Sequence, residues 1–560
     1  MGDSDKPSTD RSLPSRAFAY VRANPEWILL AFVFIVYFIT RTIHLKTAVM
    51  FSDESHYVRW AQLARSGNPW YSLTFDGKPP LHAWSMVPFL SLFKDPLVAG
   101  RMASVFFGAA TAVGMVLLGR ELADLKLGAL AALMYVIAPW ALLYDRTVEA
   151  EGLLLALFVF AIFFAVRAAK TGKLAWLAGT AVAVGLALLV KGTALLLYPI
   201  VPFAYLVKEP ARTRPGNKLK LWQWLVGSVG ALVVGYGISL LLHLSPAWGK
   251  RSHFISGRTK SVGEALRTLG DFPRYLGNIF SSFWHLLTPV FFILCMAGLV
   301  LALLLRWRPS YFLWVWLAIA TGIICLISKN FWDRFYLVLL PPVLIGGAFA
   351  VYTFARFVAK VVAEKRQSWR KVTALSLLGA LLVALLVVVP VSVKAAKPID
   401  YRLVPGGNYL GMDTTRTVNY LERRTGAGPV EVLTASRDKG FLSRTLLMYL
   451  AGNKKVKLTD LDHPIAAGPI PPPRSTSLAA VLDKNSAQIE KALATGRPVY
   501  LLADSISSTG ALDGWSVDVV DRYAYPKSTE LDITTVNPAP TENAKTYLLR
   551  VNGKAGGSPP

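Results

Sequence analysis

The segment FSDESHYVRWAQL, Phe51 to Leu63, places two adjacent carboxylates directly after an apolar run that is long enough to cross a bilayer. A serine followed by two acids suits the first turn of a helix, so a purely structural helix start is one interpretation. We expect this helix to lie on the membrane surface. Its geometry predicts that Asp53, Tyr57 and Trp60 share one face. Glu54 then points about 100° away, so the two carboxylates should have different partners.

Composition indicates an integral membrane protein. The chain of 560 residues is 54% hydrophobic and has a mean hydropathy of +0.43, which is too apolar for one soluble core. Its net charge of +26 comes largely from Lys and Arg in short loops between apolar runs, a pattern typical of membrane topology signals rather than of a nucleic-acid surface. Cys295 and Cys325 both lie inside apolar runs, which argues against a disulfide framework or a thiolate metal site.

Apolar runs of about 17–25 residues predict roughly eleven membrane spans in a transmembrane domain over residues 27–394. No small-residue cleavage site follows the first run, so we interpret it as a retained span after a cytosolic tail, residues 1–26. The spans are expected near residues 27–43, 96–119, 127–143, 152–167, 174–190, 193–207, 222–243, 283–305, 310–327, 335–355 and 372–393.

The basic loops orient these spans. Residues 208–221 carry five basic side chains against one glutamate, and residues 356–371 carry six against one. Both loops should be cytoplasmic, which also puts the N-terminus in the cytoplasm and the C-terminus outside. The outer segments are then residues 45–95, 144–151, 191–192, 244–282, 329–334 and the tail after 394.

The tail, residues 395–560, is less apolar and predicts a soluble extracytoplasmic α/β domain. Residues 430–434 and 499–502 read as short buried strands, and residues 443–451 and 477–494 have helix-like patterns.

Charged motifs gather in the outer segments. FDGKPPLHAW, Phe75 to Trp84, contains a Pro79-Pro80 pair that interrupts any helix and presents Lys78 and His82 near the membrane. YDRTVEAEGLLL, Tyr144 to Leu155, crowds four charges into a short turn. These could form a solvated hairpin tip with a local Arg146–Glu149 ion pair, or a functional site. The four charged residues are Asp145, Arg146, Glu149 and Glu151.

Two further motifs carry basic residues. Lys191 lies between two short apolar runs, and KNFWDRFYLVLLPP, Lys329 to Pro342, holds Asp333, Arg334 and Tyr336 before a proline pair that should kink its helix. Basic residues are uncommon on the outer face of a membrane protein, so a ligand with a phosphate group would explain them. The residues concerned are Lys78, Arg146, Lys191, Lys329 and Arg334.

Together these motifs resemble the multi-spanning glycosyltransferases of the GT-C fold that use polyprenyl-phosphate sugars, which include protein O-mannosyltransferases and the bacterial aminoarabinose transferase of lipid A. The resemblance covers roughly residues 25–345. It rests on the acid pair at 53–54, GKPPLHAW at 77–84, DRTVEAE at 145–151, LLVKGTALLLYP at 188–199 and DRFYLVLLPP at 333–342.

The resemblance implies site residues by position. The first-loop acid, proposed as the catalytic base in the family, falls on Asp53. The partner acid falls on Glu151, where many members have Asp, with Glu149 as a second candidate. Lys78 and Arg334 match residues near the donor phosphate, and we add Lys191 and Arg146 to that group. Substrate-binding or supporting roles are expected for Glu54, Tyr57, Arg59, His82, Glu149 and Tyr336.

The implied activity is transfer of a sugar from a polyprenyl-phosphate donor to an acceptor hydroxyl, with inversion. A base must take the hydroxyl proton, and cations or a metal must stabilise the phosphate that leaves. Asp53 and Glu151 could also hold a divalent cation, and no other cofactor is expected. The expected partners are the lipid-linked donor, a lipid, glycan or protein acceptor and the bilayer, but no nucleic acid.

We expect a multi-pass protein of a cell membrane, a bacterial plasma membrane, with its active site and C-terminal domain outside the cytoplasm. The main alternative is a transporter of an anionic or lipid-linked substrate, which predicts charged sites near the bilayer midplane and paired repeats. A non-catalytic scaffold that binds polyprenyl lipids is a second alternative. Oligosaccharyl or phosphate transfer remains open within the enzyme interpretation.

Overall fold

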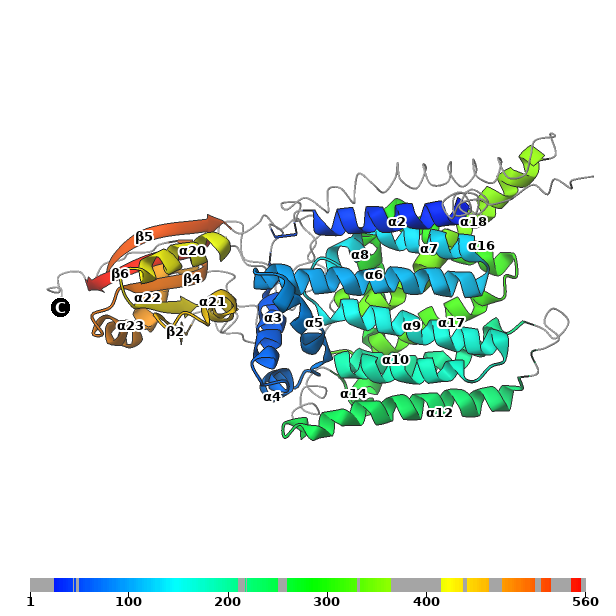
Figure 1. Cartoon of the computed structure of the whole chain (residues 1–560), viewed down its shortest axis with the longest axis horizontal. Coiled ribbons are helices and arrows are strands. Elements are labelled where there is room, and N and C mark those ends of the chain that lie inside the picture. Colours follow the sequence, from blue (N-terminus) through cyan, green and yellow to red (C-terminus); the bar gives the residue numbers. More distant parts are fainter. Residues whose placement is uncertain are drawn as a thin grey trace, which may run out of the picture.

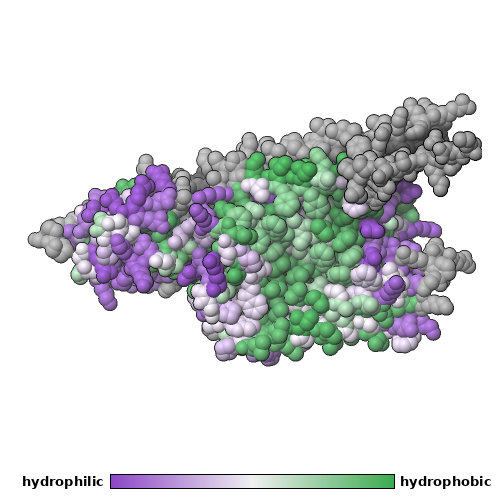
Figure 2. All heavy atoms as spheres, viewed as in Figure 1, coloured by the Kyte–Doolittle hydropathy of each residue, from purple (hydrophilic) through white to green (hydrophobic). Residues whose placement is uncertain are grey.

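The protein consists of a large helical part and a smaller sheet domain that lies beyond one end of the helices (Figure 1). On the face shown in Figure 2, hydrophobic side chains cover the middle of the helical part, and hydrophilic side chains gather on the sheet domain and at the opposite end. The computed structural model describes residues 25–43, 45–46, 50–209, 217, 219–249, 259–329, 333–363, 414–436, 441–462, 476–508, 515–524 and 545–554.

Helices occupy ten of the eleven predicted spans, and the eleventh, 372–393, lies outside the described residues. Among the described residues, five helices are long and apolar enough to cross a membrane, or six if the pair 269–286 and 289–304, bent by 116°, forms one span. The helices over the predicted spans are α2 (Pro25–Thr42), α6 (Pro96–Leu122), α7 (Leu125–Ile137), α8 (Pro139–Tyr144), α9 (Ala150–Thr171), α10 (Trp176–Val190), α11 (Leu197–Ile200), α12 (Leu221–Ser239), α15 (Phe272–Leu286), α16 (Pro289–Leu304), α17 (Pro309–Ile327) and α18 (Leu340–Ala363).

Several predicted spans are completed by 3-10 helices. The segment 192–207 consists of η1 (Gly192–Leu196), α11 and η2 (Val201–Val207), and η3 (Leu240–Leu244) extends α12. The predicted kink at Pro341-Pro342 takes a different form. A 3-10 helix, η5 (Asp333–Leu339), precedes α18, and both prolines lie in the first turn of α18, where a missing N–H costs little.

Glycines allow the central helices to approach closely. An added Cβ at Gly298 of α16 would lie 2.0 Å from the carbonyl oxygen of Gly346 in α18. An added Cβ at Gly128 of α7 would lie 2.3 Å from the carbonyl oxygen of Val116 in α6. Small residues at such crossings maximise van der Waals contact between apolar helices that have no hydrophobic force to hold them together in lipid.

Three helices of the first loop cover the end of the bundle that faces the sheet domain (Figure 1). The predicted surface helix is present as α3 (Ser52–Arg65), followed by α4 (Tyr71–Asp76) and α5 (Leu81–Leu92). Gly77 ends α4 with a left-handed backbone, φ +67°, which glycine adopts without a steric penalty. The proline pair then separates α4 from α5, as predicted, and α5 begins directly after it.

The C-terminal domain is built on one mixed sheet with strand order β2-β1-β4-β6-β5, and β3 (Thr476–Ser477) pairs with β4. The predicted strands are present as β1 (Val430–Ala435) and β4 (Val499–Ser508), and apolar side chains such as Leu433 and Leu501 form its core. The remaining elements are β2 (Val456–Leu461), β5 (Trp515–Ala524), β6 (Lys545–Lys554), α20 (Thr414–Thr425), α21 (Phe441–Leu450), α22 (Leu478–Lys484) and α23 (Ser486–Leu493).

The sheet domain touches the first loop through α21. The side-chain amide of Gln62 in α3 donates to the carbonyl of Met448 at 2.8 Å, and the Tyr449 hydroxyl donates to Asp95 at 3.4 Å. The domain therefore contacts the helix that carries the two adjacent carboxylates.

Candidate active site

Glu54 anchors α3 to the helical bundle. Its carboxylate accepts two hydrogen bonds from Arg101 of α6, at 2.9 Å from Nε and 2.8 Å from Nη2, and both side chains are 0% exposed. The same carboxylate accepts from the backbone N–H groups of Val148 and Phe51, each at 2.9 Å. The Glu54 carboxylate therefore joins three separate chain segments.

Asp53 points to a different set of partners. Its Oδ2 lies 3.0 Å from Nη1 of Arg334 in η5, and its side chain is 21% exposed, whereas that of Glu54 is fully buried. The helical geometry predicted this divergence of the two acids. Asp53 is thus the carboxylate of the pair that a molecule outside the protein can reach.

Arg334 is the centre of the charged cluster. Its Nη1 also lies 3.0 Å from Oε1 of Glu149, and its Nε lies 3.6 Å from Oε1 of Glu151. The guanidinium group therefore contacts three carboxylates that come from α3, from the turn before α9 and from the first turn of α9. The hairpin-tip interpretation proposed an ion pair between Glu149 and Arg146. In the structure Glu149 pairs with the distant Arg334 instead.

Two lysines complete the cluster. Lys191, between α10 and η1, forms an ion pair with Glu151, and its ammonium group lies 4.5 Å from the centre of the Phe335 ring. Lys78 pairs with Asp76 at 3.1 Å and lies 5.1 Å from the centre of the Tyr57 ring. The charges of both lysines and of Arg334 act on Asp53.

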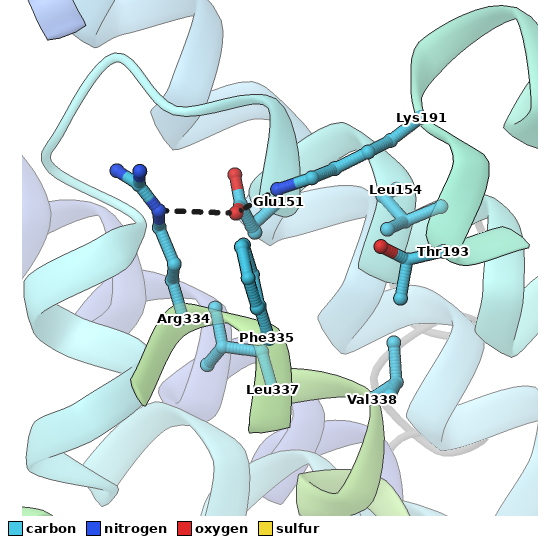
Figure 3. Close-up of a pocket in the computed structure, with 8 residues that line it drawn as sticks. All are labelled: Glu151, Leu154, Lys191, Thr193, Arg334, Phe335, Leu337 and Val338. Carbon is cyan, nitrogen blue, oxygen red and sulfur yellow. Dashed lines mark hydrogen bonds and ion pairs between the residues drawn. The ribbon is translucent and has the colours of Figure 1, made fainter. Parts of the chain in front are cut away.

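A small, narrow pocket opens beside this cluster. Figure 3 shows Glu151 between the side chains of Lys191 and Arg334, with the Phe335 ring next to them. The pocket is lined by Glu151, Leu154, Lys191, Thr193, Arg334, Phe335, Leu337 and Val338. Cations and apolar side chains thus line the same small space, a combination that suits a phosphate attached to a lipid.

Burial and neighbouring charges set the protonation of the two acids outside the spanning helices. Burial raises the pKa of Asp53, but the Lys78 and Arg334 cations outweigh it and hold the pKa below its ordinary value. Burial raises the pKa of Glu149 well above its ordinary value, with Arg334 opposing that rise and Asp53 adding to it. The neighbouring cations therefore favour the ionised form of Asp53, whereas burial favours the neutral form of Glu149.

His82 belongs to the wall of the site. The ring is 1% exposed, and its centre lies 4.7 Å from the centre of the Tyr57 ring. Burial lowers the pKa of His82 to about 3, so the imidazole is neutral. Neither ring nitrogen has a hydrogen-bond partner within the part of the chain that the structure describes.

A divalent cation was one expectation for Asp53 and Glu151. Arg334 lies between these two carboxylates and contacts both. Over the described ranges no group of three or more His, Cys, Asp or Glu side chains is arranged to hold a metal ion. A cation bound here would have to displace the guanidinium group, so the donor set does not fit a resident metal.

Four predicted residues lie apart from the Arg334 cluster. Arg146 donates to the carbonyl of Ile43 at 2.7 Å, and burial lowers its pKa to about 10 next to the like-charged Arg101 and Arg41. Arg59 donates to the side chain of Gln62 at 3.2 Å, and Lys329 pairs with Glu264 at 3.5 Å. The hydroxyl of Tyr336 is buried and has no hydrogen-bond partner among the described residues.

The sequence interpretation missed several partners of the site. Arg101 is one of them, although a lone arginine within an apolar run is itself a signal, because a buried charge requires a partner. The same signal applies to Arg41, which pairs with Asp145 at 3.2 Å. Phe335 carried no signal beyond its position next to Arg334 in the motif.

Comparisons with known proteins agree with this architecture. The family of dolichyl-phosphate-mannose-protein mannosyltransferases matches residues 77–237. No curated protein matches the chain by sequence.

Solved structures of two proteins are similar to most of the chain. ArnT from Cupriavidus metallidurans in the apo state is 14% identical with a TM-score of 0.52, covering 95% of this chain and 98% of that one. ArnT bound to undecaprenyl phosphate is 15% identical with a TM-score of 0.51, covering 93% and 97%. The archaeal oligosaccharyltransferase AglB from Archaeoglobus fulgidus, in complex with an inhibitory peptide and a dolichol-phosphate, is 12% identical with a TM-score of 0.50, covering 87% and 70%.

These likenesses confirm the resemblance that the motifs carry, with the similarity extending through the helical part into the C-terminal domain. The chain therefore has the GT-C fold of the membrane glycosyltransferases that use polyprenyl-phosphate sugars.

Proposed function

We propose that this protein is a membrane glycosyltransferase that moves a sugar from a polyprenyl-phosphate donor to an acceptor hydroxyl on the extracytoplasmic face. One observation carries the proposal. The partly exposed carboxylate of Asp53 lies 3.0 Å from the guanidinium group of Arg334. Arg334 also contacts Glu149 and Glu151, and Glu151 pairs with Lys191. A pocket with apolar walls lies beside these groups. The similarity to ArnT with undecaprenyl phosphate and to AglB with dolichol-phosphate supports a donor of the same class.

The cations have a clear role in this reaction. As the bond between the anomeric carbon and the phosphate oxygen breaks, its electron pair moves to the phosphate and a second negative charge develops there. Arg334, Lys78 and Lys191 are the groups proposed to bind this phosphate, since a preorganised cation stabilises a developing charge most where water is excluded. Glu151 supports them by holding Lys191 and by contacting Arg334.

Asp53 is proposed as the base that accepts the proton of the acceptor hydroxyl. In the resting site Arg334 and Lys78 keep its pKa low, which ensures that the carboxylate is ionised but makes it a weak base. A donor phosphate that attracts these cations would relieve Asp53 and raise its basicity when the acceptor binds. The hydroxyl oxygen then bonds to the anomeric carbon from the face opposite the phosphate, which gives inversion.

Glu54 is proposed to position this base and not to contact substrate. Its contacts with Arg101, Val148 and Phe51 hold the first turn of α3 against the bundle. Because Asp53 and Glu54 are neighbours on one helix, the contacts of Glu54 also fix the direction in which Asp53 points, toward Arg334.

Asp53→Asn tests the proposal. Asparagine is nearly isosteric with aspartate, so the purified variant should melt near the wild-type temperature and still bind polyprenyl phosphate, while sugar transfer falls by about 100-fold or more. Asp518→Asn, at an exposed carboxylate of the sheet domain that bonds only Asn552 in the described structure, is the matched control and should transfer at the wild-type rate.

Two results would contradict this assignment. Wild-type transfer by Asp53→Asn would show that the base lies elsewhere, with Glu151 as the next candidate. Movement of labelled donor across a vesicle membrane, without any transfer to an acceptor, would favour the transporter interpretation instead. Analysis of the anomeric configuration of the product would test inversion.

A further inference from the structure

The donor phosphate and Glu149 compete for the same nitrogen. Nη1 of Arg334 lies 3.0 Å from both Asp53 and Glu149, so a phosphate that binds Arg334 must come within reach of the Glu149 carboxyl group. Glu149 is only 1% exposed, so little water surrounds its carboxyl group. An ionised Glu149 would therefore repel the phosphate across a short, desolvated distance.

The surroundings of Glu149 determine its charge. It is faced by Arg334 of η5, by Asp53 and Tyr57 of α3, by Glu151 of α9 and by Lys191. Lys191 forms its ion pair with Glu151, and Arg334 is shared among all three acids.

One atom of Glu149 also lacks a partner. Its Oε2 is buried and has no hydrogen-bond partner within the described residues. An unpaired carboxylate oxygen is costly to bury, whereas a protonated oxygen there provides a donor that a ligand can accept.

We propose that Glu149 is a neutral carboxylic acid in the resting site and donates its proton as a hydrogen bond to the phosphate of the lipid-linked donor. This inference rests on the proposed function, because it requires a phosphate at Arg334. Burial, and after it the negative charges of Asp53 and Glu151, raise the pKa of Glu149, which agrees with this proposal.

A protonated Glu149 contributes more to the transition state than to the ground state. The bound phosphodiester carries one negative charge, and the leaving phosphate carries two. A hydrogen bond from the acid strengthens as this charge grows, so it lowers the barrier in addition to permitting binding. The acid remains a donor throughout, while the proton of the acceptor hydroxyl goes to Asp53.

The test is the pH dependence of donor-phosphate binding. The probe is a polyprenyl methyl phosphate diester, which keeps one negative charge from acidic to alkaline pH. If only the protonated Glu149 admits it, wild-type affinity is constant at low pH and falls about tenfold per pH unit once the pH exceeds the pKa of Glu149. Glu149→Gln, whose amide donates at every pH, should lose that decline.

Lys191 requires a control, because burial lowers its pKa while Glu151 opposes the shift, and loss of its charge would also weaken binding at high pH. Lys191→Arg retains a positive charge over the whole range. The decline should persist in this variant if Glu149 causes it. A decline that disappears in Lys191→Arg and persists in Glu149→Gln would assign the effect to the lysine and overturn the proposal.

A second measurement uses the wild-type protein alone. Above the pKa of Glu149, binding of the diester should take up one proton, which calorimetry detects by comparing buffers with different ionisation enthalpies. No proton uptake and a flat affinity across the pH range would overturn the role of Glu149 while leaving the donor site intact. Failure of the wild-type protein to bind the diester at any pH would instead refute the proposed function.

Discussion

Glu54→Gln tests whether Glu54 holds the helix in place while the adjacent Asp53 acts as the base. The substitution keeps the size of the side chain but removes its charge, and it replaces one acceptor oxygen by an amide that faces hydrogen-bond donors on every side. Those donors are Nε and Nη2 of Arg101 and the N–H groups of Val148 and Phe51. Arg101 then loses its carboxylate partner while it stays buried, and the carbonyl of Leu45 still accepts one of its hydrogen bonds.

The magnitude follows from burial. Both members of the Glu54–Arg101 pair are 0% exposed, and removal of one partner of a fully buried pair costs about 3–5 kcal/mol. The matched control is Lys554→Gln, which breaks an exposed pair with Glu490 at 2.6 Å, where the side chains are 57% and 49% exposed. Solvent screening reduces the cost of that change to roughly 0–1 kcal/mol.

The assay is unfolding of the purified protein in detergent, combined with transfer activity per folded molecule. Glu54→Gln should lose both stability and activity, whereas Asp53→Asn should lose activity alone. The double variant Glu54→Gln with Arg101→Met removes both charges, and it should be more stable than the sum of the single effects by about 0.5–3 kcal/mol. The reasoning is refuted if Glu54→Gln unfolds within about 0.5 kcal/mol of the wild type, the range of ordinary surface changes.

Three further outcomes are expected. Lys78→Ala should weaken binding of a polyprenyl phosphate diester by about 1–3 kcal/mol, the scale of a charge-assisted contact, and unchanged affinity in a binding titration would remove this lysine from the donor site. Gly298→Ala should lower the melting temperature, because the added methyl group would collide with a backbone carbonyl of α18. Gly322→Ala should leave the melting temperature unchanged, because no atom lies within 4 Å of the added Cβ. Cysteines introduced at the exposed Ser66 and Gln488 should both react with an impermeant maleimide in intact cells. Both native cysteines are buried and should give little background labelling. Labelling at only one of the two positions would contradict the prediction that the first loop and the C-terminal tail lie on the same outer face.

The sequence by itself determined the elements whose signals are local. Apolar runs located the helices because each run must satisfy its backbone internally in lipid. The spacing of Asp53, Tyr57 and Trp60 established their common face, and Lys78 indeed lies over the rings of the last two. The strands at 430 and 499 were readable because both faces of a central parallel strand are buried, and its residues are therefore mostly apolar.

Elements with weaker local sequence signals were not predicted. β5 was not predicted, because it is at the edge of the sheet and its side chains are partly exposed, which breaks the apolar run. The number of spans also depends on more than hydropathy, since several apolar runs form helices too short or too bent to cross a membrane alone.

The identity of each ion-pair partner was decided only by the tertiary structure. The motifs placed Glu149 next to Arg146, yet Glu149 pairs with Arg334, 185 residues away, and Glu54 pairs with Arg101. A charged side chain takes the partner that reaches it after the helices have packed, because a buried charge that is left without one costs several kcal/mol. Residue order specifies which groups lie at the end of a span, but helix packing specifies which of them meet.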